Sequence, residues 1–295
     1  MPRLSSDFLT GLELSDRLGE LIERAGELKD GRPSVGADSL ARRSVALIFE
    51  QPSTRTRVSF EVGIAELAGT PVVLRSDEMQ ISRGESIGDV ARVLSRFVHA
   101  IVIRSGSDER VIELAEAADV PVINALTPLH HPCQALADLL TLRERFGELE
   151  GLRVAFVGDG NNVARSLALL GGVAGLEVVV SSPPGFELEA EAGAELIPDP
   201  VEAVAGADAV YADVWFSMND GGAAAESRRE ALEPYRVDAA LVAAASERAV
   251  VMHCLPAHPG EEITADVLYG ERSAVFDQAE NRLHAQKALL EMVVE

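Results

Sequence analysis

Short apolar runs rich in β-branched residues alternate with helical patterns along almost the whole chain, and this alternation is the feature that most restricts the fold. The runs form two series, at 44–50, 71–75, 99–105 and 121–126 and then at 152–158, 176–182, 208–214 and 248–255. Strands that alternate with helices predict parallel sheets covered by helices on both faces. Two series of four strands therefore predict two three-layer αβα domains.

Three further segments bear on how these domains are organised. Residues 132–147 predict a helix that joins the two series, and residues 279–294 predict a closing helix. The glycine- and alanine-rich residues 219–227 predict a mobile loop. In open parallel sheets ligands bind beyond the carboxyl ends of the strands, so we expect functional residues at those ends.

Composition and charge exclude several classes of partner. The formal net charge of −22 argues against nucleic acid and anionic membrane as partners. No apolar run approaches the ~20 residues that span a bilayer, and the N-terminal segment becomes polar too early for a secretory signal peptide. We therefore expect a cytoplasmic protein. Its two cysteines, Cys133 and Cys254, lie far apart without metal-ligand spacing, so we expect neither a disulfide framework nor a metal site.

The segment "STRTR" at 53–57 crowds hydrogen-bond donors just after the first apolar run. Pro52 ends that run, and an apolar pattern with helical spacing follows, so a helix begins near Ser53 or Thr54. A helix N-terminus offers unpaired N–H groups and a positive dipole end. A lone Ser-Thr pair would predict only a capped helix, but two interleaved arginines favour a phosphate pocket. Its side chains would be Ser53, Thr54, Arg55 and Thr56.

Three more polar side chains follow apolar runs. Arg104 ends the third run, where a strand-end arginine and an anion ligand are equally good interpretations. His131 and Gln134 lie at the predicted start of the joining helix. Both can hydrogen-bond a carbonyl or an amide there, although a simple helix cap with proline at its first position is an equal alternative.

The segment at 153–170 looks like a nucleotide-binding turn, because a predicted strand leads through glycines into a helix. The G-x-G-x-x-G pattern nevertheless fails, since Val163 occupies the place of the third glycine. No acidic residue ends the next run to hold a ribose hydroxyl. The dinucleotide hypothesis is therefore weak, and Asn161 and Asn162 suit a carboxylate or another small polar group instead.

Five short motifs occur in order along the chain. They are "STRTR" at 53–57, "HPCQ" at 131–134, "DVWFSM" at 213–218, "HCLP" at 253–256 and "ENR" at 280–282. In order and spacing they resemble the ornithine carbamoyltransferases within the aspartate/ornithine carbamoyltransferase family, and the resemblance covers essentially the whole chain.

The resemblance implies a carbamoyltransferase of arginine biosynthesis with its active site in the cleft between two domains. Residues 1–143, completed by a C-terminal helix at 278–295, would bind carbamoyl phosphate. Residues 144–277 would bind ornithine. The resemblance also implies a homotrimer or a multiple of trimers, and a reaction without metal or organic cofactor.

The resemblance further implies roles for individual residues. The ligands of carbamoyl phosphate would be Ser53, Thr54, Arg55, Thr56, Gln80, Arg104, His131, Gln134, the backbone of Leu255, and Arg282. The ligands of ornithine would be Asn162, Asp213, Ser217, Met218 and Cys254. The catalytic residues would be Arg104, His131, Asp213 and Cys254. Gln80 lies in a segment that matches a loop reaching the neighbouring subunit's site.

Substrate choice depends on the second domain. Ser217 and Met218 resemble the ornithine-binding loop, and the segment 77–86 lacks the lysine that aspartate carbamoyltransferases carry there. Asn219 stands where the family usually has glycine, which keeps a putrescine carbamoyltransferase as an alternative. A non-catalytic relative that senses phosphate or an amino acid is a second alternative, and a nicotinamide dehydrogenase is a third.

Overall fold

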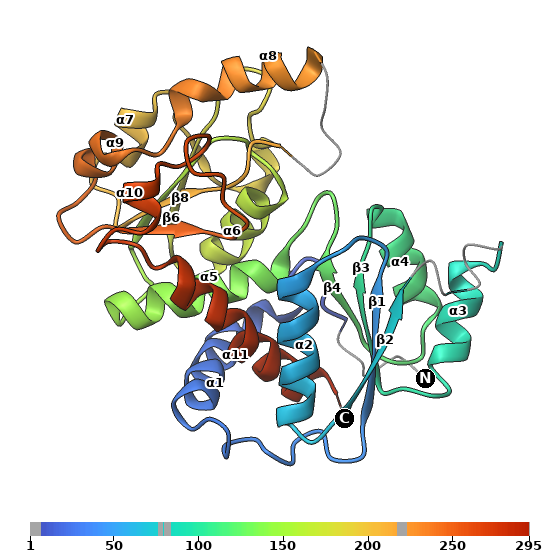
Figure 1. Ribbon diagram of the computed structural model, residues 1–295. Helices are drawn as coiled ribbons and strands as arrows, with labels where there is room; N and C mark the ends of the chain where they lie inside the picture. The colour runs from blue at the N-terminus through green and yellow to red at the C-terminus, as the bar shows by residue number, and fades with distance from the viewer. Residues whose placement is uncertain (1–6, 76–78, 80–83, 217–222, 295) are drawn as a thin grey trace. The chain divides into compact units, whose positions relative to one another are not determined.

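The computed structural model describes residues 7–75, 79, 84–216 and 223–294. The chain divides into two compact units, of which the first comprises residues 1–140 and 280–295 and the second residues 141–279. The boundaries fall within two long helices, α5 (Pro132–Phe146) and α11 (Val275–Val293) (Figure 1). In the part of the chain that the structure describes, no helix is long and apolar enough to cross a membrane.

The first unit is built on four parallel strands in the order β2-β1-β3-β4. They are β1 (Ser44–Phe49), β2 (Thr70–Arg75), β3 (Ala100–Arg104) and β4 (Val122–Leu126). The central strands β1 and β3 are almost completely buried because both faces of the sheet are covered. This burial explains their near-continuous apolar sequence.

Helices cover both faces of this first sheet (Figure 1). α3 (Ile87–Leu94) and α4 (Asp108–Ala117) pack on one face, where Ile48, Ile101 and Ile103 meet Val90 and Leu114 in a buried cluster. α1 (Leu18–Asp30), which follows the 3-10 helix η1 (Leu12–Arg17), lies on the other face with α2 (Thr54–Glu66). The C-terminal part of α11 lies on that face too.

The second unit contains five parallel strands in the order β7-β6-β5-β8-β9. They are β5 (Arg153–Val157), β6 (Glu177–Ser181), β7 (Glu195–Leu196), β8 (Ala209–Ala212) and β9 (Val250–His253). The helical elements are α6 (Asn162–Val173), η3 (Ala190–Ala192), α7 (Pro200–Val204), α8 (Ala223–Leu232), η4 (Glu233–Tyr235), α9 (Ala239–Ala244) and α10 (Ala265–Leu268).

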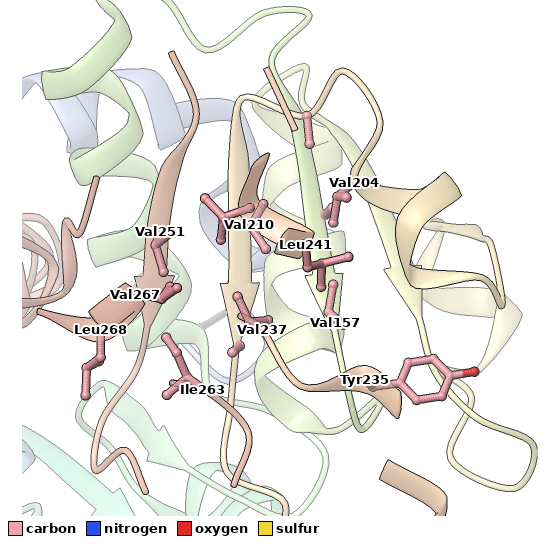
Figure 2. Close-up of a cluster of buried hydrophobic side chains, with 14 of the residues drawn as sticks. Val157, Val204, Val210, Tyr235, Val237, Leu241, Val251, Ile263, Val267 and Leu268 are labelled. Carbon is pink, nitrogen blue, oxygen red and sulfur yellow. The ribbon is translucent and has the colours of Figure 1, made fainter. Parts of the chain in front are cut away.

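Figure 2 shows the core on one face of this second sheet. Alternate strand residues such as Val157, Val210 and Val251 point toward Leu241 of α9 and Val267 of α10. Their neighbours in sequence point to the opposite face, where the rings of Phe156 and Tyr211 stack with centroids 5.2 Å apart. Because successive side chains of a strand point to opposite faces, each strand contributes residues to the hydrophobic packing on both faces of the sheet.

The prediction of two parallel-sheet α/β domains is confirmed, with two local corrections. The second sheet has a fifth strand, β7, whose two residues are too few to form a pattern in the sequence. The predicted loop at 219–227 is wrong from Ala223 onward, because α8 begins there. Ala223 to Ala225 are the strongest helix formers, and their propensity outweighs the glycines that precede them. Residues 219–222 lie outside the described part of the chain.

Candidate functional site

The predicted phosphate pocket lies at the N-terminus of α2, directly beyond the end of β1. Ser53 caps this helix, and its hydroxyl accepts the backbone N–H of Thr56 over 3.4 Å. Thr54 and Arg55 form the exposed first turn, whereas the Thr56 side chain is buried. The structure thus combines N–H groups, hydroxyls and a guanidinium at one helix end, as phosphate recognition requires.

Arg282 of α11 extends this pocket, although it lies at the far end of the sequence. Its Nη1 donates to Gln134 Oε1 over 2.8 Å, and its Nη2 donates to Thr56 Oγ1 over 3.2 Å. The Gln134 amide nitrogen donates in turn to Asp138 Oδ1 over 2.8 Å. All four side chains are buried. Because each contact fixes the next, the guanidinium of Arg282 is held in one orientation beside α2.

His131 lies at the start of α5 and is 5% exposed. Burial is the main cause that lowers its pKa well below 6.5, and the positive charges of Arg282, Arg104 and Arg55 add to the effect. His131 is therefore neutral at physiological pH, and one ring nitrogen carries a proton that it can donate. The four predicted ligands His131, Arg282, Arg104 and Arg55 share one electrostatic environment in the first unit.

The second unit brings three predicted or candidate polar residues together at the carboxyl ends of β5, β8 and β9. Asn161 caps α6, since its Oδ1 accepts the N–H groups of Val163 and Ala164 over 2.9 and 3.2 Å. Its amide nitrogen donates to Asp213 Oδ2 over 2.7 Å. The other carboxylate oxygen of Asp213 accepts from Cys254 Sγ over 2.8 Å. Asn162 is the first residue of α6, beside this network.

The turn after β9 carries Cys254 and Leu255. Leu255 has a left-handed backbone with φ of 58°, and its N–H donates to His253 Nδ1 over 2.9 Å. Asp213, His253 and Cys254 offer possible metal ligand atoms that all lie within 4.8 Å of one another. Both ring nitrogens of His253 already have partners, in the Leu255 N–H and in Glu262. The geometry therefore favours a hydrogen-bonded network over metal ligation.

Gly160 explains why the segment at 153–170 looks like a nucleotide-binding turn. A Cβ on Gly160 would lie 2.3 Å from the backbone nitrogen of Leu188, and Gly158 has a φ of 128° that side chains rarely adopt. The glycines thus permit a tight turn packed against a neighbouring loop. The dinucleotide hypothesis gains no support from them.

Three predicted site residues, Gln80, Ser217 and Met218, lie outside the described residues, as does Asn219. Conversely, sequence reasoning did not include two residues, Asp138 and Glu262, that take part in these hydrogen-bond networks. Asp138 could have been found, because it is a charged residue four positions after Gln134 in an otherwise apolar helical pattern. Asn161, which the sequence offers with Asn162 as a candidate for a small polar ligand, caps α6 and contacts Asp213. Glu262, which contacts His253, has no signal in the sequence.

Comparison with known families gives the decisive observation. The model described as aspartate/ornithine carbamoyltransferase, carbamoyl-P binding domain, matches residues 6–144. The model described as aspartate/ornithine carbamoyltransferase, Asp/Orn binding domain, matches residues 150–293. The chain belongs to the aspartate/ornithine carbamoyltransferase family. The resemblance that the five motifs indicate is therefore confirmed.

Individual members of this family are similar to the chain over nearly its full length. The ornithine carbamoyltransferase of Acidothermus cellulolyticus is 51% identical, covering 99% of this chain and 96% of its own. That of Bacillus subtilis is 46% identical, covering 98% of this chain and 93% of its own. Among solved structures, the ornithine carbamoyltransferase from Pyrococcus furiosus has a TM-score of 0.91 at 45% identity, covering 100% of this chain and 99% of its own.

Proposed function

We propose that the protein is an ornithine carbamoyltransferase, which transfers the carbamoyl group of carbamoyl phosphate to the δ-amine of L-ornithine and yields L-citrulline and phosphate. The observation that carries this proposal is the buried chain of contacts from Asp138 through Gln134 and Arg282 to Thr56 at the N-terminus of α2. These contacts lie in the unit that matches the carbamoyl-phosphate-binding model, and they support an anion site there. Relatives at about half identity bear the same name.

In this proposal the phosphate binds to Ser53, Thr54, Arg55 and Thr56. Arg104, His131 and Arg282 donate toward the carbamoyl oxygen, where negative charge grows as the amine attacks. Preorganised donors of this kind contribute about 2.7–4 kcal/mol each to lowering a barrier. A neutral His131 suits the role, since its N–H can stabilise this charge without losing the proton. Gln134 assists in holding the carbamoyl group.

The amino-acid substrate binds to the second unit in this proposal. Asp213 is a carboxylate held by Asn161 and Cys254, and it suits the α-ammonium group of ornithine. The δ-amine must attack as the neutral base, although a free alkylamine has a pKa of about 10.4, as lysine does. Burial of the amine favours the neutral form. The departing phosphate can accept the proton.

Several finer features belong to the same proposal. Residues 1–143 with the helix at 278–295 form the carbamoyl-phosphate-binding domain, and residues 144–277 form the ornithine-binding domain. The protein acts in arginine biosynthesis in the cytoplasm, as a homotrimer or a multiple of trimers. Gln80, Ser217, Met218, Asn162 and the Leu255 backbone contribute the ligand contacts that the family resemblance implies. Sedimentation equilibrium tests the trimer directly, because a monomeric mass would contradict it.

The test of the function is citrulline formation from carbamoyl phosphate, with ornithine and putrescine as parallel acceptors. Product with ornithine alone is the expected result. Product mainly with putrescine would retain the family chemistry but reject ornithine as the acceptor. No product with either amine, from a protein that still binds carbamoyl phosphate, would favour the non-catalytic sensor.

A further inference from the structure

Glu262 is a buried carboxylate in the loop between β9 and α10, and it is 1% exposed. Its Oε1 accepts the backbone N–H of His258 and lies 3.2 Å from Nε2 of His253, a ring that is also buried. His258 Nδ1 is 3.8 Å from the other carboxylate oxygen, but the His258 side chain is half exposed. The principal partner of this carboxylate is therefore His253.

The contacts of His253 determine which of its ring nitrogens carries the proton. Because the Leu255 N–H donates to Nδ1 over 2.9 Å, Nδ1 must be the acceptor. The proton is then on Nε2 and is donated to Glu262 Oε1. The backbone N–H of His253 also donates to Gln278 Oε1 over 2.9 Å. The imidazole thus connects Glu262 to the backbone of Leu255.

This connection acts on the turn that carries two predicted site residues. Leu255 has a left-handed backbone, which is unfavourable for a residue with a branched side chain unless its surroundings hold it there. Cys254, one position earlier, donates to Asp213 over 2.8 Å. A rotation of the His253 ring would release the Leu255 N–H and shift both residues relative to Asp213.

We infer that Glu262 is a positioning residue for the carbamoyl transfer, and that it acts through the Nε2–H tautomer of His253 to hold the Cys254–Leu255 turn. The inference rests on the proposed function and extends it to a residue outside the ligand set. Mutation of a group that orients a catalytic site can cost about 10²-fold in rate, since even a 1 Å displacement does so. The phosphate pocket of the first unit should be unaffected.

The experiment compares Glu262→Met, Glu262→Gln and the neighbouring Glu261→Gln, whose side chain pairs with Arg229. Urea unfolding identifies conditions where all variants are folded, and calorimetry measures the affinity for inorganic phosphate. Glu262→Met should lower kcat for citrulline formation about 10²-fold at unchanged phosphate affinity. Glu262→Gln, which keeps an acceptor oxygen, should restore most of the activity. Glu261→Gln should behave like the parent protein.

Full activity in folded Glu262→Met would overturn the inference, and so would a Glu262→Gln variant as impaired as Glu262→Met. Nitrogen-15 NMR of His253 provides a readout that needs no activity, since it distinguishes the two ring tautomers. The Nε2–H form supports the inference, and the Nδ1–H form overturns it even if Glu262→Met does not fold. A parent protein that forms no citrulline would reject the proposed function instead, and the tautomer would still decide the positioning.

Discussion

Arg282 donates to Gln134 over 2.8 Å, although 148 residues separate them along the chain. The same guanidinium reaches Thr56, which is 226 residues away. Both contacts require α11 to pack beside the first turns of α2 and α5, so the proposed anion site would form only in the folded first unit. They make Arg282 the first target for mutation.

Replacing Arg282 with methionine should lower kcat/KM for carbamoyl phosphate by about 10²–10³-fold, because one preorganised donor is lost. The buried Gln134 oxygen would also lose its partner. Steady-state kinetics at saturating ornithine measure the effect. Arg17→Met is the matched control, since Arg17 forms an exposed ion pair with Glu20, and it should leave the kinetics unchanged. A loss below tenfold in Arg282→Met would contradict the assignment.

Stability should fall as the pH drops below about 6.5, partly because of His131. Its folded-state pKa is lowered by burial and neighbouring arginines, so the unfolded chain binds a proton that the folded chain does not. Each such group contributes up to 1.36 kcal/mol per pH unit, from about 6.5 down to its folded-state pKa. The free energy of unfolding in urea, measured from pH 7 to 5.5, should change less in His131→Asn.

A second histidine provides a check on this pH dependence. Burial also lowers the pKa of His284, so the His131→Asn variant should keep part of the slope. His131→Asn combined with His284→Gln should flatten the profile further. If the free energy of unfolding of His131→Asn varied with pH as steeply as that of the parent protein, His131 could not be a buried neutral imidazole.

The two cysteines should differ sharply in reactivity. Burial raises the pKa of Cys133 to about 12, and its thiol donates to the carbonyl of Asn124 over 3.4 Å. Thiolate is the reactive form, so Cys133 should not react with Ellman's reagent at pH 8 in the native protein. Cys254 is partly exposed and should react. One equivalent is expected before denaturation and two afterwards, and the Cys254→Ser variant should show none before denaturation.

Asn161 should contribute to stability and to ornithine binding through separate contacts. Asn161→Ala removes the cap of α6 and should cost about 1 kcal/mol in the free energy of unfolding. Asn161→Ser can still cap the helix, but its shorter side chain cannot reach Asp213 as the amide does. It should therefore retain stability and raise the KM for ornithine. Equal ornithine KM values in Asn161→Ser and the parent protein would show that the Asp213 contact is dispensable.

Two glycines in the same unit should respond oppositely to alanine. A Cβ at Gly160 would overlap the backbone of Leu188, so Gly160→Ala should destabilise the protein by about 1–3 kcal/mol. Gly172 lies in α6 with nothing within 4 Å of an added Cβ, so Gly172→Ala should stabilise by about 0.5–1 kcal/mol. Urea unfolding of both variants tests the pair. A stable Gly160→Ala would mean that the close approach to Leu188 is not required.

Local features of the chain were largely predictable from its sequence. The start of α2 after Ser53 follows from capping and apolar spacing, and the parallel sheets follow from buried β-branched runs between helices. Such features depend on interactions among residues a few positions apart. The strand β7 escaped prediction because its two residues show no period. The family was predictable because five motifs retain their order, and the match to the family models confirms it. The ligand roles of the site residues stay predictions.

The amino-acid sequence is enough to predict the alternation of strands and helices, the helix start at "STRTR" and the motifs that identify the family. Which side chains hold these motifs in place depends on the folded chain. Asp213 contacts Cys254 from 41 residues away, and Arg282 contacts Thr56 from 226 residues away. Buried polar groups must find partners wherever packing brings them, and no local pattern records which partner that will be.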